Sequence, residues 1–165
     1  MKQAFVCLGS NMGDAMQNLE RARRELAALP GVCTVTASQI YRTEPQGRKE
    51  QPWFLNQVLR LECMEDMTAC GLLEAMLDME TGMGRIRDSS DRFGPRVIDM
   101  DLLLFGEECS SDPHVTLPHP RMSERAFVLV PLAELAPDLR LPDGRSIHSL
   151  LNALNYRLSG TSIFQ

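Results

Sequence analysis

Two aspartates separated by a single residue are the strongest chemical signal in the sequence. Asp99 and Asp101 interrupt an apolar run that continues to Phe105. In a strand, residues i and i+2 point to the same face about 7 Å apart, and two carboxylates so placed repel each other unless a cation lies between them. Magnesium prefers such oxygen ligands. For an Asp-x-Asp pair alone, however, an edge strand with a solvated acidic face is the simpler interpretation.

Two arginines just before this pair favour phosphate chemistry. Arg92 and Arg96 lie on either side of a turn formed by Gly94 and Pro95. The planar guanidinium group of arginine can bind phosphate oxygens through two parallel hydrogen bonds. Groups that bind anions and groups that bind cations are therefore adjacent in the stretch 92–105. This combination suits a metal-bound phosphate substrate better than a solvated edge strand.

Size and charge favour a small ligand over a polymer. The chain has 165 residues, which is most simply one domain over 1–165. Its formal net charge is −5, so a general nucleic-acid binder is disfavoured. Positive charge is nevertheless concentrated where Arg85 and Arg87 precede Arg92 and Arg96. An acidic protein with a locally basic pocket suits a small anionic ligand.

The cysteines and histidines form no recognisable metal or disulfide pattern. The five cysteines are odd in number and include no CxxC pair, so we expect free thiols in a reducing compartment. The first residues contain no long apolar run, and no segment reaches the length of a membrane span. We therefore expect a cytoplasmic protein with no membrane partner.

Apolar periodicity predicts an alternation of strands and helices. The predicted strands cover residues 3–8, 32–41, 54–63 and 97–105, and the predicted helices 14–29 and 67–81, followed by helices at 123–135 and 146–154. Asp14 and Gln17 have the spacing of a capping box, and Met16 is expected on the buried side of the first helix. The order β-α-β-β-α-β predicts an α+β, ferredoxin-like sandwich with helical additions at its C-terminal end.

Two long loops are expected to border the site. The predicted sheet carries two helices on one face, which leaves its other face for a site, and the loops 42–52 and 82–96 are able to close over it. For the first loop, an ordinary connection is an equally good interpretation. The sequence contains neither a Walker loop nor a complete dinucleotide fingerprint, so a nucleotide would have to be bound by other means.

Several ordered motifs carry a family resemblance. These are Leu8-Gly9-Ser10-Asn11, Tyr41-Arg42-Thr43-x-Pro45, Gln51-Pro52-x-Phe54-Leu55-Asn56, Glu80-x4-Arg85-x-Arg87, Arg92-Phe93-Gly94-Pro95-Arg96-x2-Asp99-x-Asp101, and Pro118-His119 with Arg125 and Phe127. In order and spacing they resemble the 6-hydroxymethyl-7,8-dihydropterin pyrophosphokinase family over residues 4 to about 145. The resemblance implies transfer of the pyrophosphoryl group of ATP to the hydroxymethyl oxygen of the pterin, with release of AMP, in folate biosynthesis.

The resemblance also implies a role for each matching residue. Arg85, Arg96, Asp99 and Asp101 correspond to catalytic positions, and the two aspartates would hold two Mg²⁺ ions on the triphosphate. The implied ATP contacts are Leu73, Glu80, Arg87, Arg92, Leu102, His114, Thr116, His119 and Arg125. The implied pterin contacts are Thr43, Pro45, Phe54, Asn56, Phe93, Asp99 and Phe127. Without the resemblance, Phe127 would be predicted as core and Glu80 as a helix-surface charge.

Three departures from the family pattern and three other functions remain open. Phe93 replaces a tryptophan found in many members, while His114 and Pro120 stand where arginine and tyrosine are expected.

A ferredoxin-like module that binds a small ligand without chemistry would leave ATP intact. A magnesium-dependent kinase that transfers only the γ-phosphate would release ADP. An RNA binder is disfavoured by the acidic charge, and we expect a monomer.

Overall fold

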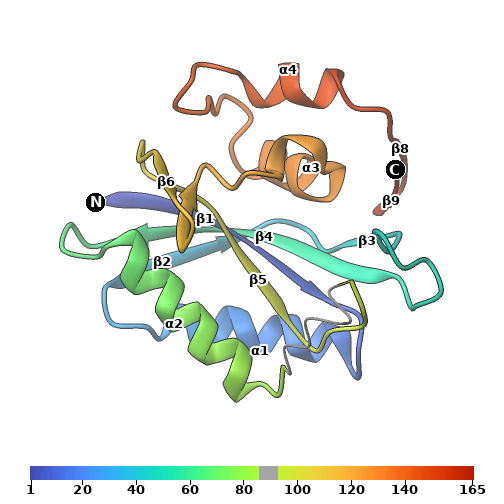
Figure 1. The fold of residues 1–165 in the computed structure, drawn as a ribbon, viewed down its shortest axis with the longest axis horizontal. Helices are drawn as coiled ribbons and strands as arrows, with labels where there is room; N and C mark the ends of the chain where they lie inside the picture. The colour runs from blue at the N-terminus through green and yellow to red at the C-terminus, as the bar shows by residue number, and fades with distance from the viewer. Residues whose placement is uncertain (86–92) are drawn as a thin grey trace.

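A mixed β-sheet lies between two layers of helices in the computed structural model, which describes residues 1–85 and 93–165 (Figure 1). The helices are α1 (Ala15–Ala27), α2 (Ala69–Gly82), α3 (Ala126–Leu135) and α4 (Ile147–Asn152), with a 3-10 helix at Met122–Glu124. The strands of the main sheet are β1 (Lys2–Ser10), β2 (Val32–Ala37), β3 (Tyr41–Thr43), β4 (Phe54–Cys63), β5 (Asp99–Phe105), β8 (Arg157–Ser159) and β9 (Ser162–Phe164). A separate hairpin contains β6 (Ser110–Asp112) and β7 (Val115–Leu117).

The central strands pair in the order β5-β1-β4-β3-β9-β8, and β2 also pairs with β4. Strand β1 is antiparallel to both β4 and β5, whereas β9 runs parallel to β3. The predicted strands at 3–8, 54–63 and 97–105 are confirmed, with the last beginning at Asp99. The hairpin β8–β9 and the β6–β7 hairpin were not predicted, because each strand is only three residues long.

The first helix begins where its capping residues predicted. The Asp14 carboxylate accepts a hydrogen bond from the backbone N–H of Gln17 at 3.1 Å, and α1 then buries Leu19, Ala22 and Leu26 against the sheet. The prediction that Met16 lies on the buried side was wrong, since 54% of this residue is exposed. Met16 lies in the first turn of α1 and is not among the residues that pack against the core.

Both faces of the sheet are covered, which corrects the expectation of a free second face. Helices α1 and α2 pack on one face, and α3 and α4 lie across the other (Figure 1). Alternate residues of β1 explain this arrangement: Val6 and Leu8 enter the first core, whereas Phe5 and Cys7 enter a second core with residues of α3 and α4. Because both sides of β1 are apolar, each side requires a covering layer.

The segment 32–41, predicted as one strand, forms two. The backbone N–H of Ser38 still donates to the carbonyl of Val58 at 2.9 Å, and the Ser38 hydroxyl accepts from the N–H of Val58. The next N–H, from Gln39, instead donates to the carboxylate of Glu134 on α3 at 2.7 Å. This bond to α3 removes Gln39 from the strand ladder, so the chain leaves the sheet after Ala37 and returns at Tyr41.

Tyr41 ties the sheet to α3 and carries a pH prediction. Burial raises the pKa of Tyr41 to about 12, and the hydrogen bond that its hydroxyl donates to Glu134 at 2.7 Å adds to the shift. An unfolded chain has a tyrosine pKa of about 10, so this group's stabilising contribution is present below pH 10 and is lost as the pH rises toward 12. We expect the free energy of unfolding of the wild type to exceed that of Tyr41→Phe at pH 9 and the difference to shrink at pH 11.5, measured by urea unfolding. A pH-independent difference would contradict the assignment.

None of the helices within 1–85 and 93–165 combines the length and apolar character needed to cross a bilayer.

The last two helices are shorter than predicted. The helix predicted at 123–135 begins at Ala126 after the 3-10 turn, and that predicted at 146–154 covers Ile147–Asn152 with Ser146 as its capping residue. The single-domain assignment and the cytoplasmic location stay predictions.

Candidate active site

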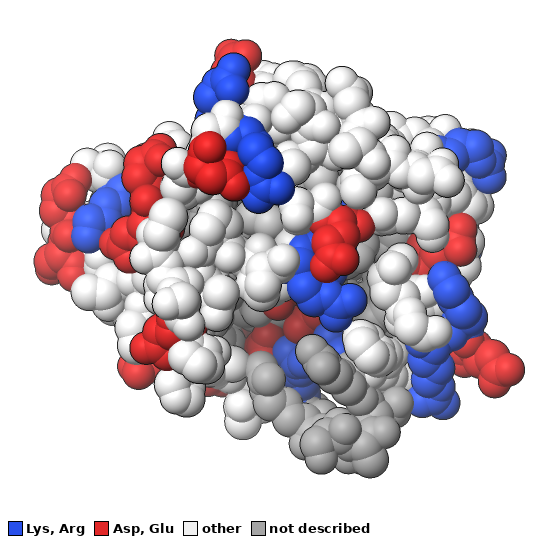
Figure 2. Space-filling view, turned by 45° about the horizontal axis from the view of Figure 1, so that its top comes forward, with Lys and Arg blue, Asp and Glu red and all other residues white. Residues whose placement is uncertain are grey.

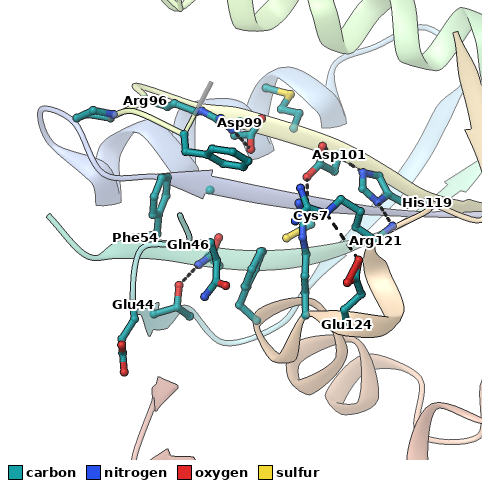
Figure 3. A pocket seen from close by; sticks show the side chains of 18 of the residues that line it. Cys7, Glu44, Gln46, Phe54, Arg96, Asp99, Asp101, His119, Arg121 and Glu124 are labelled. Atoms are coloured by element: carbon teal, nitrogen blue, oxygen red, sulfur yellow. Dashed lines mark hydrogen bonds and ion pairs between the residues drawn. The ribbon is translucent and has the colours of Figure 1, made fainter. Parts of the chain in front are cut away.

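A cavity of about 800 Å³ lies where β1 ends and where β4 and β5 begin (Figure 3). It brings together eleven of the sequence-predicted site residues, although they come from distant parts of the chain. These are Thr43, Phe54, Asn56, Arg85, Phe93, Arg96, Asp99, Asp101, His119, Arg125 and Phe127. Eleven residues named from the sequence therefore line one cavity, and their individual roles stay predictions.

Strand register places the central residues of the cavity in a row. Asp99 pairs with Gly9 on β1, and Gly9 pairs in turn with Asn56 on β4. The glycine is required there, because a Cβ atom at Gly9 would lie only 2.8 Å from the Asn56 side-chain oxygen. Two residues further along β5, Asp101 pairs with Cys7. The sheet thus fixes the separation between the carboxylates and the buried amide of Asn56.

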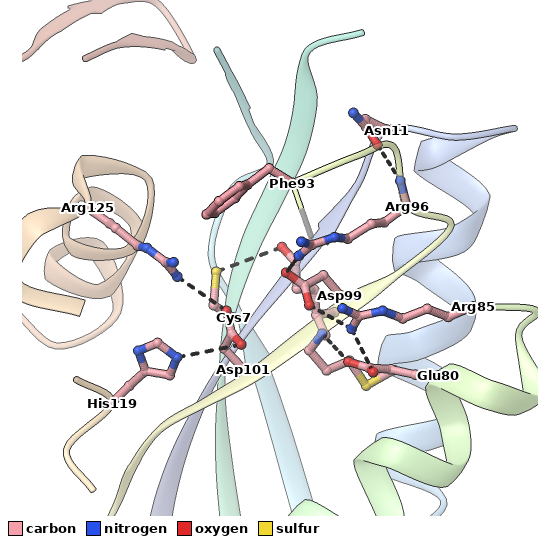
Figure 4. Close-up of polar contacts among 12 residues, drawn as sticks. Cys7, Asn11, Glu80, Arg85, Phe93, Arg96, Asp99, Asp101, His119 and Arg125 are labelled. Atoms are coloured by element: carbon pink, nitrogen blue, oxygen red, sulfur yellow. Dashed lines mark hydrogen bonds and ion pairs between the residues drawn. The ribbon is translucent and has the colours of Figure 1, made fainter. Parts of the chain in front are cut away.

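The carboxylate of Asp99 is held between two arginines (Figure 4). Arg85 Nη1 donates to Asp99 Oδ1 at 2.8 Å, and Arg96 Nη1 donates to Asp99 Oδ2 at 2.8 Å. Burial and the nearby charge of Asp101 nevertheless raise the pKa of Asp99, while the two arginines oppose this shift. Two guanidinium groups are therefore aimed at one edge of the cavity, with Asp99 fixing their orientation.

The carboxylate of Asp101 faces an imidazole and a guanidinium group. His119 Nε2 lies 3.6 Å from Oδ1, and Arg125 Nη1 lies 3.6 Å from Oδ2 (Figure 4). Burial alone would raise the pKa of Asp101, but His119 and Arg125 outweigh it and the pKa is lowered from its usual value. These contacts are longer than those of Asp99, so Asp101 is the less tightly held of the two carboxylates.

Glu80 lies behind the cavity wall and does not line the cavity. Only 1% of this residue is exposed, which excludes the helix-surface alternative. Its Oε2 accepts from Arg85 Nη1 at 2.7 Å, and its Oε1 accepts from the backbone N–H of Met100 at 2.7 Å. Glu80 therefore connects the last turn of α2 to β5 and orients Arg85 toward Asp99.

The opposite part of the cavity is aromatic and amide-lined. Phe54 and Phe127 both contribute to its walls, from β4 and α3 respectively. The buried side chain of Asn56 donates from Nδ2 to Thr43 Oγ1 at 2.6 Å. Two aromatic rings with a fixed amide and a hydroxyl suit a flat heterocycle that has both donors and acceptors on its edge.

Asn11 and Gln51 join the two loops that border the cavity. Asn11 Nδ2 donates to Gln51 Oε1 at 3.0 Å and to the carbonyl of Pro52 at 2.9 Å, while its Oδ1 accepts from the backbone N–H of Arg96 at 2.8 Å. Gln51 Nε2 also donates to the carbonyl of Phe93 at 2.6 Å. The ring of Phe93 packs against Gly47, where a Cβ would meet Cγ at 2.9 Å. The arginine-bearing loop is thereby tied to the end of β1 and to the loop before β4.

We expect Asn11→Ala to loosen this connection. The substitution removes the acceptor for the Arg96 N–H and leaves that amide open to solvent exchange. Hydrogen exchange of the Arg96 amide should become about tenfold faster, whereas Asn152→Ala, an exposed substitution at the end of α4, should leave it unchanged. Equal protection of Arg96 in wild type and Asn11→Ala would contradict this role for Asn11.

Other sequence-predicted residues lie away from the cavity. Pro45 is buried but does not line it, Leu102 belongs to the core, and Leu73 packs against that core from the surface of α2. His114 and Thr116 lie on or next to the β6–β7 hairpin, where Asp112 accepts hydrogen bonds from both. Arg87 and Arg92 fall outside the described residues.

Several residues that line the cavity were not predicted from the sequence, among them Cys7, Gln46, Arg121 and Glu124. For Cys7 a signal existed, since antiparallel pairing of the first strand with the aspartate strand places residues of the first strand beside the carboxylates. For Arg121 and Glu124 the only signal was a charged pair just before an apolar helix. Their placement depends on α3 covering the second face of the sheet, which was not expected.

Charges of both signs are interspersed on the face drawn in Figure 2. Among the described residues visible there, lysines and arginines alternate with acidic side chains and do not merge into one broad basic surface. The positive groups of the cavity are instead paired with Asp99 and Asp101. This distribution favours a compact anionic ligand over a polyanion.

Comparisons with known proteins identify the family. The family model for 7,8-dihydro-6-hydroxymethylpterin-pyrophosphokinase (HPPK) matches residues 5–137. A protein of Methylorubrum extorquens, named 2-amino-4-hydroxy-6-hydroxymethyldihydropteridine pyrophosphokinase, is 44% identical over 94% of this chain and 95% of its own length. A Pseudomonas aeruginosa protein of the same name is 42% identical over 93% of this chain and 92% of its own.

The fold agrees with these sequence matches. A crystal structure of HPPK-DHPS in complex with substrates superposes with a TM-score of 0.66 at 13% identity and covers 92% of this chain. The chain spans 43% of the length of that larger protein. At this identity the likeness supports the fold alone, and the assignment rests on the sequence matches. The chain belongs to the 7,8-dihydro-6-hydroxymethylpterin-pyrophosphokinase family.

Proposed function

We propose that this protein transfers the pyrophosphoryl group of ATP to the hydroxymethyl oxygen of 6-hydroxymethyl-7,8-dihydropterin, releasing AMP. Family membership supports the reaction. The observation that carries the proposal is the single cavity in which Arg85 and Arg96 converge on Asp99 opposite an aromatic, amide-bearing wall. One end thus suits a polyphosphate and the other a flat heterocycle, as a two-substrate transfer requires.

The heterocyclic end supplies pterin recognition. Phe54 and Phe127 offer aromatic faces, and offset stacking on such faces contributes about 0.5–1.5 kcal/mol per pair beyond area burial. Asn56 can both donate to and accept from the aminopyrimidinone edge, and its bond to Thr43 fixes the orientation of the amide. This arrangement would orient the hydroxymethyl group toward the charged end.

The charged end supplies electrostatic stabilisation of the transferred group. Charge on a phosphoryl group in transfer is spread over its oxygens, so catalysis depends on positioning and neutralisation more than on covalent help. Arg85 and Arg96 would donate to oxygens of the β-phosphate that the pterin hydroxyl attacks. His119 and Arg125 would bind the nucleotide side of the triphosphate, with Arg87 and Arg92 as further contacts.

The donor set fits magnesium. Asp99 and Asp101 present carboxylate oxygens to one cavity, and Mg²⁺ is typically bound by one or two carboxylates together with substrate phosphates and water. The described residues contain no group of three or more His, Cys, Asp or Glu side chains arranged as metal ligands, so phosphate oxygens and water would complete the coordination of the two ions. When bound, magnesium would neutralise negative charge on the triphosphate. Burial and the charge of Asp101 raise the pKa of Asp99, and a bound cation would oppose this shift by stabilising the ionised carboxylate.

The proposal also includes a ferredoxin-like arrangement of the strands and helices. We assign β1, α1, β2 with β3, β4, α2 and β5 to the ferredoxin-like βαββαβ plan, with one of its strands interrupted at residues 38–40. The strand order β5-β1-β4 followed by β2 and β3 and the antiparallel pairing of these strands support the assignment. A monomeric state and the absence of nucleic-acid partners stay predictions.

Identification of the nucleotide product tests the function. The protein is incubated with ATP, Mg²⁺ and 6-hydroxymethyl-7,8-dihydropterin, and nucleotides are separated by chromatography. We expect AMP to form only when both the pterin and Mg²⁺ are present, and EDTA to stop its formation. Formation of ADP would indicate transfer of the γ-phosphate alone, and intact ATP would indicate a binding module, so either result would contradict the proposal.

A further inference from the structure

Helix α3 begins at the cavity and is capped by a residue from another part of the chain. Its capping position is Arg125, whose side chain makes no capping hydrogen bond among the described residues. The first N–H groups of a helix have no partner within the helix. Here the Ala126 N–H donates to Gln165 Oε1 at 2.8 Å. Gln165 therefore performs, from the final residue of the sequence, the capping role usually held by a residue next to the helix.

The other end of the same amide holds the residue before Arg125. Gln165 Nε2 donates to the carbonyl oxygen of Glu124 at 2.7 Å. The side chain of Gln165 thus bridges the backbone groups on both sides of Arg125. Glu124, Arg125 and Phe127 all line the cavity, and Arg125 Nη1 lies 3.6 Å from Asp101. The position of these side chains follows from the backbone that the amide holds.

Strand β9 determines where Gln165 lies. It pairs in parallel with β3, and the Arg42 N–H donates to the carbonyl of Thr161 at 2.8 Å. Ile163 is only 2% exposed and packs in a buried cluster with Tyr41, Ala126 and Val130. A strand fixed on both its backbone and its side-chain face leaves the following Gln165 little freedom.

The same strand also supports the opposite wall of the cavity. Thr43, which bonds to Asn56, is the register partner of Ile163. The ring of Phe164 meets that of Trp53 edge-on, with centroids 5.2 Å apart, and Trp53 immediately precedes the wall residue Phe54. Strand β9 consequently contacts the Thr43 and Phe54 side through β3 and Trp53, and the Phe127 side through α3.

We propose that β9 and Gln165 set the separation of the two walls that bind the pterin, with Gln165 as a positioning residue for Arg125 and Phe127. This inference rests on the proposed function. The match to the family model ends at residue 137, so this device lies beyond the segment that the family model covers. Loss of the amide would free the first turn of α3 and widen the range of positions open to the Phe127 ring.

The expected effect of Gln165→Ala is a loss of pterin affinity. Removing one capping hydrogen bond at the end of a helix corresponds to a change of about fivefold in an equilibrium constant. We expect the Kd for the pterin to rise about fivefold, and the KM for the pterin to rise equally while kcat stays within about twofold. Gln165→Glu keeps an acceptor for the Ala126 N–H. On a logarithmic scale, its Kd for the pterin should lie about midway between those of wild type and Gln165→Ala.

Titration calorimetry measures this effect directly. 6-Hydroxymethyl-7,8-dihydropterin is titrated into protein that holds Mg²⁺ and α,β-methylene ATP, whose methylene bridge blocks release of AMP. Ser159→Ala, an exposed substitution in the same hairpin, serves as the matched control and should bind as the wild type does. Hydrogen exchange at the Ala126 amide, expected to be faster in Gln165→Ala, reports the loss of the cap without any ligand.

The other possible outcomes distinguish failure of the positioning role of Gln165 from failure of the proposed function. Equal pterin Kd values for wild type and Gln165→Ala would overturn the positioning role and leave the proposed function intact. A lowered melting temperature with unchanged pterin Kd would mean that Gln165 is merely structural, which also overturns the inference. A wild type that neither binds the pterin nor forms AMP would overturn the proposed function, and this inference with it.

Discussion

Replacing Asp99 by asparagine is expected to lower the rate of AMP formation by about 10³-fold. The substitution keeps the size of the side chain but removes the charge that Arg85 and Arg96 share at 2.8 Å each. Without that charge, the two guanidinium groups lose their common anchor and a magnesium ligand is lost. Steady-state rates at saturating ATP, pterin and Mg²⁺ measure the effect.

The control for Asp99→Asn is Asp78→Asn, which removes one negative charge from an exposed position on α2. It should turn over at the wild-type rate. Circular dichroism should show the same helix and strand content for both variants, because Asp99 lies at the cavity and not in either core. A rate for Asp99→Asn within about threefold of wild type would contradict the assigned role.

Replacing Glu80 by glutamine is expected to lower the free energy of unfolding by about 3 kcal/mol. The two carboxylate oxygens of Glu80 accept from two different donors, Arg85 Nη1 and the N–H of Met100, both at 2.7 Å. Glutamine has one acceptor oxygen, so its NH₂ group would face one of these donors in a buried position. Urea unfolding with constant m-value gives the change directly.

The same variant should also lose activity through Arg85. A misplaced guanidinium group weakens stabilisation of the transferred phosphate, so kcat should fall about tenfold or more while the KM for the pterin stays nearly constant. Glu20→Gln, at an exposed position on α1, is the matched control for both measurements. Wild-type stability and kcat in Glu80→Gln would refute the view that Glu80 orients Arg85.

Local sequence signals were sufficient for the central strands and the first two helices. The apolar residues within 54–63 predicted β4 with its observed bounds, and Asp14 predicted the start of α1. These features depend on short-range periodicity and on a side chain that bonds within its own turn. The motif around Asp99 and Asp101 was likewise local, because residues two apart in a strand share one face.

The layer formed by α3 and α4 could have been anticipated in part. The uninterrupted apolar run from Ala4 to Leu8 indicates a strand buried on both faces, which requires helices on both sides. What the sequence could not provide is the position of α3 on that face, because this depends on packing between Val128 and Leu132 on α3 and distant residues such as Phe5. Arg121 and Glu124 were missed for that reason.

Hydrogen bonds between residues that are distant in the sequence could not be predicted from local sequence patterns. The bond between Glu80 and the Met100 N–H, the bridging amide of Asn11 and the capping of α3 by Gln165 each join residues far apart in the sequence. The split of residues 32–41 has the same origin, since Glu134 on α3 competes for the N–H of Gln39. In each case a tertiary hydrogen bond overrides or supplements a local preference.

In the proposed reaction, both terminal phosphates of ATP move together to the pterin. It is tested most directly with ATP labelled with ³²P at the β position in one reaction and at the γ position in another, followed by separation of the pterin product. We expect equal molar incorporation of both labels into the pterin, matched by an equal amount of AMP. Incorporation of the γ label alone, with the β label retained in ADP, would contradict it.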